Sequence, residues 1–205
     1  MKALIEVLSN TLLYLESSRD ELRDLDAAIG DGDLGITVTS GARAVREALA
    51  ALPEDAVVSD VLKVSAKQFG SANPSTFAAL ISGGLLAAYK IVPATSEIDK
   101  EISLQILQAL FDSIKSRGKA ELGDKTILDA IAPALAVLQS ENNLKADELL
   151  IRLIGVVETS IEETSKLISR QGRAAWIGER TIGHRDAGST AFLRFLEALH
   201  HSLNK

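Results

Sequence analysis

The sequence contains no cysteine, few aromatic residues and no long hydrophobic run. Without cysteine the chain forms neither disulfides nor thiolate metal sites, and this absence fits a cytoplasmic protein. Aromatic residues make up 4% of the chain, so we expect a core of Leu, Ile, Val and Ala, which suits closely packed helices. No stretch reaches the roughly 20 apolar residues that span a bilayer. We therefore expect no membrane segment, and the interrupted N-terminus predicts no signal peptide.

Positive charge is also scarce. The chain has 22 Lys and Arg residues against 28 Asp and Glu residues, which gives a formal net charge of -6. This balance argues against general nucleic-acid binding, which requires a basic face. The three histidines form no cluster suited to zinc. A phosphate ligand remains compatible with the acidic charge, because metal ions can supply positive charge locally.

Apolar residues recur at helical spacing along nearly the whole chain, and no run alternates as a strand would. The pattern predicts an all-α protein with a single domain over residues 1–205, because no linker divides the chain. Gly83 and Gly84 lie in its most apolar helix and predict the close approach of a neighbour. The predicted helices cover residues 4–15, 38–52, 57–69, 76–91, 98–114, 126–138, 146–169 and 189–203.

Glycine is concentrated in four segments between helices, at residues 30–35, 70–74, 118–123 and 172–188. The first of them carries three carboxylates within eight residues, on Asp26, Asp31 and Asp33. Like charges this close repel one another, and a hard cation such as Mg²⁺ relieves that repulsion. If residues 31–33 are extended, the last two side chains point the same way. The alternative is an acidic surface turn, since Asp and Gly are common turn residues.

The middle two glycine segments contain candidate helix caps and lysines. Asn73 or Ser75 can cap the helix that follows, and the free N–H groups at its start favour phosphate; an ordinary capped turn is the alternative. Asp124 resembles another N-cap. Lys119 and Lys125 could reach a phosphate, but we expect both to be solvated loop lysines.

The fourth glycine segment is the most unusual, because it holds three arginines and the only tryptophan. Arginine can grip phosphate or stack on a base. Asp186 precedes a helix and could cap it or accept hydrogen bonds from a ligand. We expect His184 to be structural and not an acid or base.

Together these segments resemble the L subunit of dihydroxyacetone kinase (DhaL), which is equivalent to the nucleotide-binding domain of single-chain ATP-dependent dihydroxyacetone kinases. The resemblance covers nearly the whole chain and keeps the order of the segments. It is carried by three motifs: Asp26…Gly30-Asp31-Gly32-Asp33…Gly35, Arg117-Gly118-Lys119-Ala120-Glu121…Gly123-Asp124-Lys125-Thr126, and Gly172-Arg173-Ala174…Gly178-Glu179-Arg180…Ile182-Gly183-His184…Asp186…Gly188.

The resemblance implies an eight-helix antiparallel barrel that holds ADP or ATP at one end. It also implies that Asp26, Asp31 and Asp33 hold two Mg²⁺ ions bridging the nucleotide phosphates, and that this subunit has no catalytic residue beyond the metal site. The remaining residues implied to line the nucleotide are Leu34, Gly35, Thr37, Ser71, Ala72, Gly118, Ile127, Arg173, Asp186 and Gly188.

The resemblance further implies two kinds of partner. A separate sugar-binding subunit would hold the small hydroxy-ketone substrate, and in one branch of the family a phosphohistidine phosphocarrier protein rephosphorylates bound ADP. The chain departs from the family at Leu34, where His is usual, at Ala72, where Ser is usual, and at Ala187, where Pro is common. Two other readings follow: a nucleotide-binding regulatory subunit that signals through a protein partner, or a helical adaptor with a vestigial site.

Overall fold

A computed structural model describes residues 1–95 and 97–205, and its regular structure in those residues is entirely helical. The all-α prediction is therefore confirmed. The α-helices are α1 (Lys2–Leu15), α2 (Arg19–Ile29), α3 (Leu34–Leu49), α4 (Val58–Ala72), α5 (Thr76–Ile91), α6 (Lys100–Gly118), α7 (Ile127–Ser140), α8 (Ala146–Ser165) and α9 (Ala187–Leu203). The 3₁₀ helices are η1 (Glu16–Ser18), η2 (Arg173–Trp176) and η3 (Gly178–Thr181).

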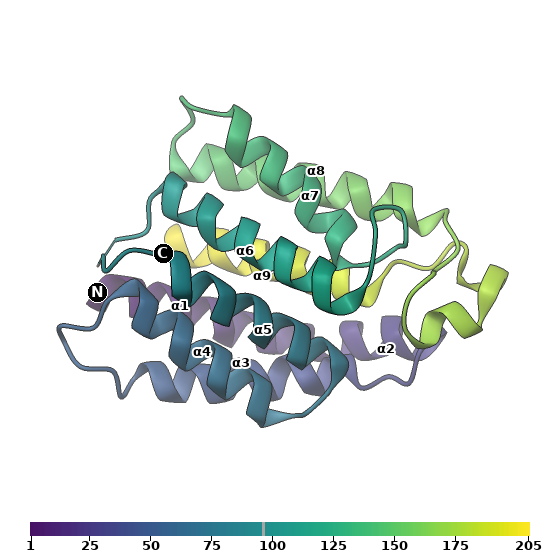
Figure 1. Ribbon diagram of the computed structural model, residues 1–205, viewed down its shortest axis with the longest axis horizontal. Helices are drawn as coiled ribbons and strands as arrows, with labels where there is room; N and C mark the ends of the chain where they lie inside the picture. The colour runs from purple at the N-terminus through teal and green to yellow at the C-terminus, as the bar shows by residue number, and fades with distance from the viewer. Residues whose placement is uncertain (96) are drawn as a thin grey trace.

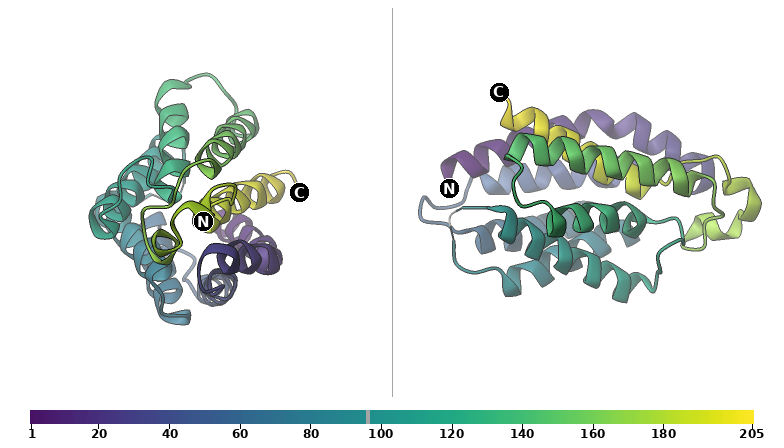
Figure 2. Two further views of the ribbon diagram at one scale, coloured as in Figure 1. Left: turned by 90° about the vertical axis from the view of Figure 1, so that its right-hand side faces the viewer. Right: turned by 90° about the horizontal axis from the view of Figure 1, so that it is seen from above.

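The helices form a closed antiparallel ring, as the ribbon views show (Figure 1 and Figure 2). α1 packs against α3, each later helix packs against the next, and α9 returns to α1. α1, η1 and α2 follow one another without an intervening residue, so they act as one member of the ring. Counted in this way, the ring has eight members, and the prediction of an eight-helix barrel is confirmed.

The antiparallel arrangement brings the four glycine segments to one end of the barrel. Because successive helices run in opposite directions, every second connection lies at the same end. The connections that lead into α3, α5, α7 and α9 all lie at the right-hand end of Figure 1, and both chain termini lie at the left. Segments spread over about 160 positions of the sequence thus face a common region.

Aliphatic residues fill the barrel, as the scarcity of aromatic residues predicts. One core cluster joins α7, α8 and α9 around the fully buried Val157 and Leu193. A second joins α1, α3, α4 and α5 around Ala42 and Leu49. The predicted close approach at the glycine pair is also found, since a Cβ on Gly84 would lie 2.9 Å from Cγ of Leu110 in α6. Here the glycine lets two helices pack backbone to side chain.

Several helix boundaries differ by three or four residues from the predicted ones, and one helix was not predicted. The helix that was not predicted is α2, whose apolar pattern is weak because it buries only Leu22 and Ile29. α3 begins at Leu34, four residues before its predicted start. α8 ends at Ser165, four residues early, because the N–H of Ser169 donates to Thr181 Oγ1 at 2.9 Å and not to the carbonyl four residues before it.

None of the helices in the described part of the chain is long and apolar enough to cross a membrane.

Candidate functional site

Three carboxylates converge where α2 gives way to α3. Asp26 lies in the last turn of α2, and Asp31 and Asp33 lie in the short connection to α3. One carboxylate oxygen of each residue lies within 4.8 Å of the others. Oxygens around one Mg²⁺ are about 3 Å apart when adjacent and about 4.2 Å apart when opposite, from metal–oxygen distances of about 2.1 Å. The three side chains therefore fit a magnesium site with only small adjustments.

The backbone that brings the carboxylates together is a turn and not an extended segment. Gly32 has φ of +75°, a conformation that L side chains rarely adopt. Asp33 has φ of −90° and ψ of −12°, which is already helical. The side chains are therefore not arranged as in an extended stretch, because α3 begins immediately after Asp33. The prediction that the carboxylates approach one another is confirmed.

Two further glycines shape this turn, because neighbouring atoms occupy the space that a side chain would need. A Cβ on Gly30 would lie 2.5 Å from Oδ1 of Asp26, so the carboxylate occupies the place of that methyl group. A Cβ on Gly35 would lie 2.2 Å from the carbonyl oxygen of Arg19, which holds α3 against the start of α2. Both glycines are required by close approach, and their positions fix Asp26 and the first turn of α3.

The electrostatics of the turn favour a cation. Burial raises the pKa of Asp33, and the charges of Asp31 and Asp26 raise it further. A divalent cation would offset this repulsion directly. The carboxylate of Asp26 is oriented by the N–H of Leu34, which donates to Oδ2 at 3.2 Å. The Asp33 side chain makes no capping hydrogen bond to α3, so its oxygens are available.

Leu34 itself contributes to the core at this point. Its side chain is 6% exposed and packs with Leu15, Leu22 and Val38. The predicted contact between Leu34 and a nucleotide can therefore involve only its backbone, whose N–H already bonds Asp26. The position where the family usually has histidine faces the interior of this barrel.

Arg173 comes from the far end of the chain and forms an ion pair with Asp31. It begins η2 and directly follows Gly172, which has φ of +62°. The predicted nucleotide-binding arginine therefore lies beside the predicted metal ligands, although 142 positions separate the two. Its guanidinium is well exposed, so it can reach either a carboxylate or a ligand phosphate.

A polar network joins the first turn of α3 to the start of α5. The buried Thr37 accepts a hydrogen bond from Asn73 Nδ2 at 2.9 Å and donates one to Ser75 Oγ at 3.3 Å. Ser75 caps α5 by accepting the N–H of Ala78, which confirms one of the two predicted caps. Ser71 and Ala72 occupy the exposed last turn of α4 beside this network. The role of Asn73 was missed, because nothing in the sequence links it to Thr37.

The last predicted contacts gather where α7 and α9 begin. Asp186 caps α9 by accepting the N–H of Ser189 at 2.7 Å, as expected, and burial raises the pKa of its carboxyl. A Cβ on Gly188 would lie 3.3 Å from a ring carbon of Phe77 and 3.7 Å from Cβ of Ile127. Gly118 ends α6 at the same end of the barrel. These residues therefore share one region, as predicted.

Two predictions for the connection between α6 and α7 are wrong. Lys125 is only 2% exposed, so it is not a solvated loop lysine, because three main-chain carbonyls enclose its ammonium group. Asp124 does not cap α7, since Thr126 does. Its carboxylate instead accepts the N–H of Glu121 at 2.9 Å and the amide of Gln171 at 2.8 Å. Both side chains serve long-range contacts that no local pattern indicates.

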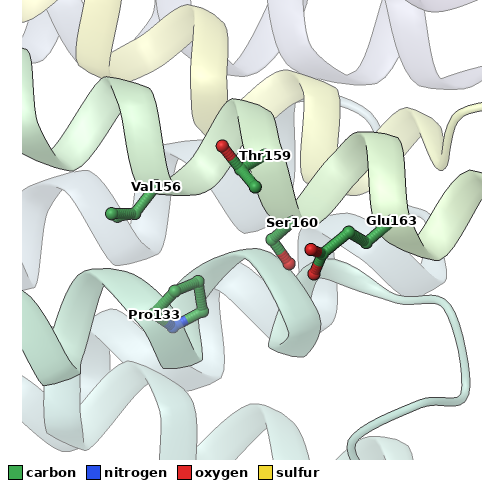
Figure 3. A pocket seen from close by; sticks show the side chains of 5 residues that line it. All are labelled: Pro133, Val156, Thr159, Ser160 and Glu163. Carbon is green, nitrogen blue, oxygen red and sulfur yellow. The ribbon is translucent and has the colours of Figure 1, made fainter.

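A shallow groove of about 310 Å³ lies between α7 and α8 (Figure 3). None of the predicted site residues lines it; the lining side chains are Pro133, Val156, Thr159, Ser160 and Glu163. Ser160 donates to the carbonyl of Asp129 at 2.6 Å. Pro133 has no N–H and leaves that carbonyl without its helical donor. The groove is therefore explained by a packing feature of two helices.

Solved structures share this fold. The dihydroxyacetone kinase of C. freundii in its native form superposes with a TM-score of 0.75 at 23% identity, covering 98% of this chain and 34% of that chain. The same kinase in complex with AMP-PNP and Mg²⁺ gives a TM-score of 0.74 at 21% identity. At these identities the likeness concerns the fold, and this chain spans about a third of the length of that kinase.

Sequence comparison identifies the family as well as the fold. The chain is 32% identical over 209 residues to the ADP-binding subunit DhaL of PEP-dependent dihydroxyacetone kinase 2 from Listeria innocua, covering 97% of this chain and 93% of the relative. It is 32% identical over 180 residues to the corresponding subunit of Escherichia coli, covering 87% and 85%. Residues 28–201 match the DAK2 domain. The chain therefore belongs to the DAK2 domain family.

Proposed function

We propose that this chain is the nucleotide-binding, phosphoryl-transferring subunit of a dihydroxyacetone-type kinase. The observation that carries the proposal is the convergence of Asp26, Asp31 and Asp33 within 4.8 Å at the start of a helix, with Arg173 beside them. Helix N-termini favour anions, and carboxylates favour Mg²⁺. The combination suits a magnesium-bound nucleotide better than either ligand alone.

The relatives support this proposal. Those from Listeria innocua and Escherichia coli are described as ADP-binding subunits of PEP-dependent dihydroxyacetone kinases. The C. freundii kinase of the same fold is described in complex with AMP-PNP and Mg²⁺. We extend to this chain the binding of ADP or ATP with two Mg²⁺ ions on the three aspartates.

Phosphoryl transfer asks a protein mainly for positioning and charge neutralisation. When bound, the magnesium ions would neutralise the phosphate oxygens and the developing charge between nucleotide and acceptor. Asp26, Asp31 and Asp33 would hold the ions. Arg173 would exchange its bond to Asp31 for one to a phosphate, because Asp31 is engaged by metal in that state.

The rest of the predicted nucleotide site remains a proposal on the same grounds. Its members lie at the same end of the barrel as the aspartates: Leu34 and Gly35 through their backbone, then Thr37, Ser71, Ala72, Gly118, Ile127, Asp186 and Gly188. Thr37 would act through the network that holds α3 against α5. Asp186 and Gly188 would set the start of α9 against the nucleotide.

The acceptor in this proposal is a small hydroxy-ketone held by a separate sugar-binding subunit. The terminal phosphoryl group would pass from the nucleotide to a hydroxyl of that substrate. Two relatives are named as subunits of PEP-dependent kinases; in such a system, a phosphohistidine phosphocarrier protein would rephosphorylate the bound ADP. The cytoplasmic location remains a prediction, to be checked by cell fractionation.

Calorimetric titration of ADP into metal-stripped protein, with and without Mg²⁺, tests the nucleotide site. We expect binding only with Mg²⁺, and we expect Asp31→Ala to abolish it. Asp24→Ala is the matched control, because Asp24 is an exposed carboxylate of α2 outside the cluster. Unchanged magnesium-dependent affinity in Asp31→Ala would contradict the proposal.

The same titration, together with an assay of phosphoryl transfer, separates the proposed kinase subunit from the other two readings. Magnesium-dependent ADP binding without transfer to any hydroxy-ketone, in the presence of a sugar-binding subunit, would indicate a regulatory subunit. No binding of ADP in either condition would indicate an adaptor with a vestigial site.

A further inference from the structure

The buried Lys125 has no part in the function proposed above, although its ammonium group is one of the least exposed charges in the described chain. The residue lies directly before the cap of α7, with φ of +63° and 2% exposure. Nζ donates to the carbonyl oxygens of Ser165 and Leu167, each at 3.1 Å, and of Thr181 at 2.5 Å. An ammonium group has three donors, so all of them are used.

The three acceptors come from both ends of one segment. Ser165 and Leu167 lie where α8 ends, at the negative end of its dipole, and Thr181 closes η3. The side chain therefore ties the start of the segment 166–183 to its far side. We call residues 166–183 the arginine segment, because Arg173 lies within it.

The loop that carries Lys125 holds the arginine segment at further points nearby. The carbonyl of Asp124 accepts the N–H of Arg170 at 3.0 Å, and the Asp124 carboxylate accepts the amide of Gln171 at 2.8 Å. Gly183 closes the segment by donating to the carbonyl of Ser165 at 2.8 Å. Gln171 is the anchored position nearest to Arg173, two residues before it.

Burial of a lysine is costly unless its charge is compensated. Burial lowers the pKa of Lys125, and the charge of Asp186 opposes that shift. An apolar residue of similar length would fill the same space but leave carbonyl oxygens with fewer donors. The ammonium group is thus required by the arginine segment and not by the core of the barrel.

We propose that Lys125 is a positioning residue for the nucleotide site: it holds the arginine segment in the conformation that places Arg173 over the aspartates. Lys125 does not hydrogen-bond the aspartates, because its three donors bond to main-chain carbonyls. It acts through Arg173, whose guanidinium must meet a phosphate within hydrogen-bonding distance to contribute. The inference rests on the proposed function, since it assigns a purpose to Arg173.

The test compares Lys125→Met with Lys166→Met. Lys166 belongs to the same segment and is exposed. Its substitution therefore removes a charge without disturbing the buried hydrogen bonds of Lys125. We expect Lys125→Met to weaken binding of ADP with Mg²⁺ by about tenfold, a common cost of losing a supporting residue, and Lys166→Met to leave it unchanged. Equal affinity in Lys125→Met and the wild type would overturn the proposal.

A double-mutant cycle with Arg173→Gln separates positioning from general destabilisation. If Lys125 acts through Arg173, the two substitutions together should cost no more affinity than Arg173→Gln alone. Additive losses would assign Lys125 a role independent of Arg173 and would overturn the proposal. The only tryptophan, Trp176, lies in η2, so its fluorescence anisotropy should fall in Lys125→Met and not in Lys166→Met.

Hydrogen exchange of the wild-type protein keeps the inference testable if Lys125→Met fails to fold. Without nucleotide, the N–H groups of Ser169, Arg170 and Gly183 should exchange slowly, because each donates one of the hydrogen bonds that anchor the segment. Exchange at unprotected rates would overturn the proposal. If the wild type shows these protections but binds no ADP with Mg²⁺, the proposed function fails while the anchoring of the segment stands.

Discussion

The aspartate turn and the arginine segment meet at one end of the barrel but are built in different ways. The aspartate turn places Asp26, Asp31 and Asp33 together within eight consecutive positions, using glycines that the same stretch supplies. The arginine segment has short 3₁₀ helices and is held by residues from elsewhere, above all Lys125. A local turn can be recognised in a sequence, whereas an anchored segment cannot.

The strongest way to break the aspartate turn is steric. Gly35→Ala places a Cβ 2.2 Å from the carbonyl oxygen of Arg19, which is backbone and cannot move aside cheaply. We expect the free energy of unfolding to fall by about 3 kcal/mol, at the upper end for overpacking, in urea denaturation. Gly155→Ala is the control, since its Cβ would meet nothing within 4 Å; in the interior of α8 it should raise stability by up to about 1 kcal/mol. Similar changes in both variants would contradict the close approach.

We expect the arginine segment to be destabilised by the loss of a buried hydrogen bond and not by a steric clash. Thr181 is fully buried, and its hydroxyl accepts the N–H of Ser169. Thr181→Val leaves that buried donor unpaired, so we expect a loss of about 2 kcal/mol in the free energy of unfolding. Thr159→Val is the control, because Thr159 bonds only within its own exposed helix face. A loss no larger than that of the control would argue against an anchored segment.

Replacing glycine by alanine at Gly30 and at Gly172 compares the aspartate turn and the arginine segment with the same type of substitution. Gly30→Ala displaces the Asp26 carboxylate, because its Cβ would lie 2.5 Å from Oδ1. We expect ADP binding with Mg²⁺ to weaken about tenfold, as for other changes that move a metal ligand. Gly172→Ala meets no atom within 4 Å but has φ of +62°, so it should cost about 1 kcal/mol of stability through backbone strain. Calorimetry and denaturation of both variants would check this division; equal effects on binding would contradict it.

The smallest expected effect concerns the contact between α2, which leads into the aspartate turn, and α9, which follows the arginine segment. Arg194 hydrogen-bonds Glu21 at 2.6 Å and lowers the pKa of that carboxyl, while partial burial opposes the shift. A depressed folded-state pKa contributes stability above the ordinary carboxyl pKa, and this contribution is lost as pH falls through the folded-state value. Both side chains are partly exposed and screened by solvent, so we expect Glu21→Gln to cost less than about 1 kcal/mol at pH 7.

The pH dependence of this cost is the decisive measurement. Urea denaturation should show the difference between Glu21→Gln and the wild type shrinking toward zero at acid pH. Glu47→Gln, an exposed carboxyl on α3, should show no such trend. A difference that stays constant down to acid pH would contradict the ion pair.

The chain departs from the family at Leu34, Ala72 and Ala187, and the structure gives the first of these departures a physical meaning. Leu34 stands where the family usually has histidine, and its side chain packs into the core with Leu22 and Val38. The aspartate turn therefore keeps its carboxylates while losing a polar side chain at the neighbouring position. Ala72 lies exposed at the end of α4, where nothing in the structure explains the substitution.

The sequence by itself determined the helical class and most of the helices, because apolar residues recur with the period of a helix. The core of small aliphatic residues and the caps Ser75 and Asp186 were also readable, since a cap bonds within its own first turn. The convergence of the three aspartates belongs to the same category. All these features depend on residues within a few positions of one another.

Only the tertiary structure decided the features that join distant positions. The sequence could not indicate that Lys125 is buried, that Asn73 bonds Thr37, or that Arg173 reaches Asp31 across 142 positions. It also could not place the end of α8, because Thr181 takes the N–H of Ser169 that would have continued the helix. Such contacts depend on how the ring of helices closes, and a local pattern carries no record of which remote carbonyl or carboxylate will lie opposite a given side chain.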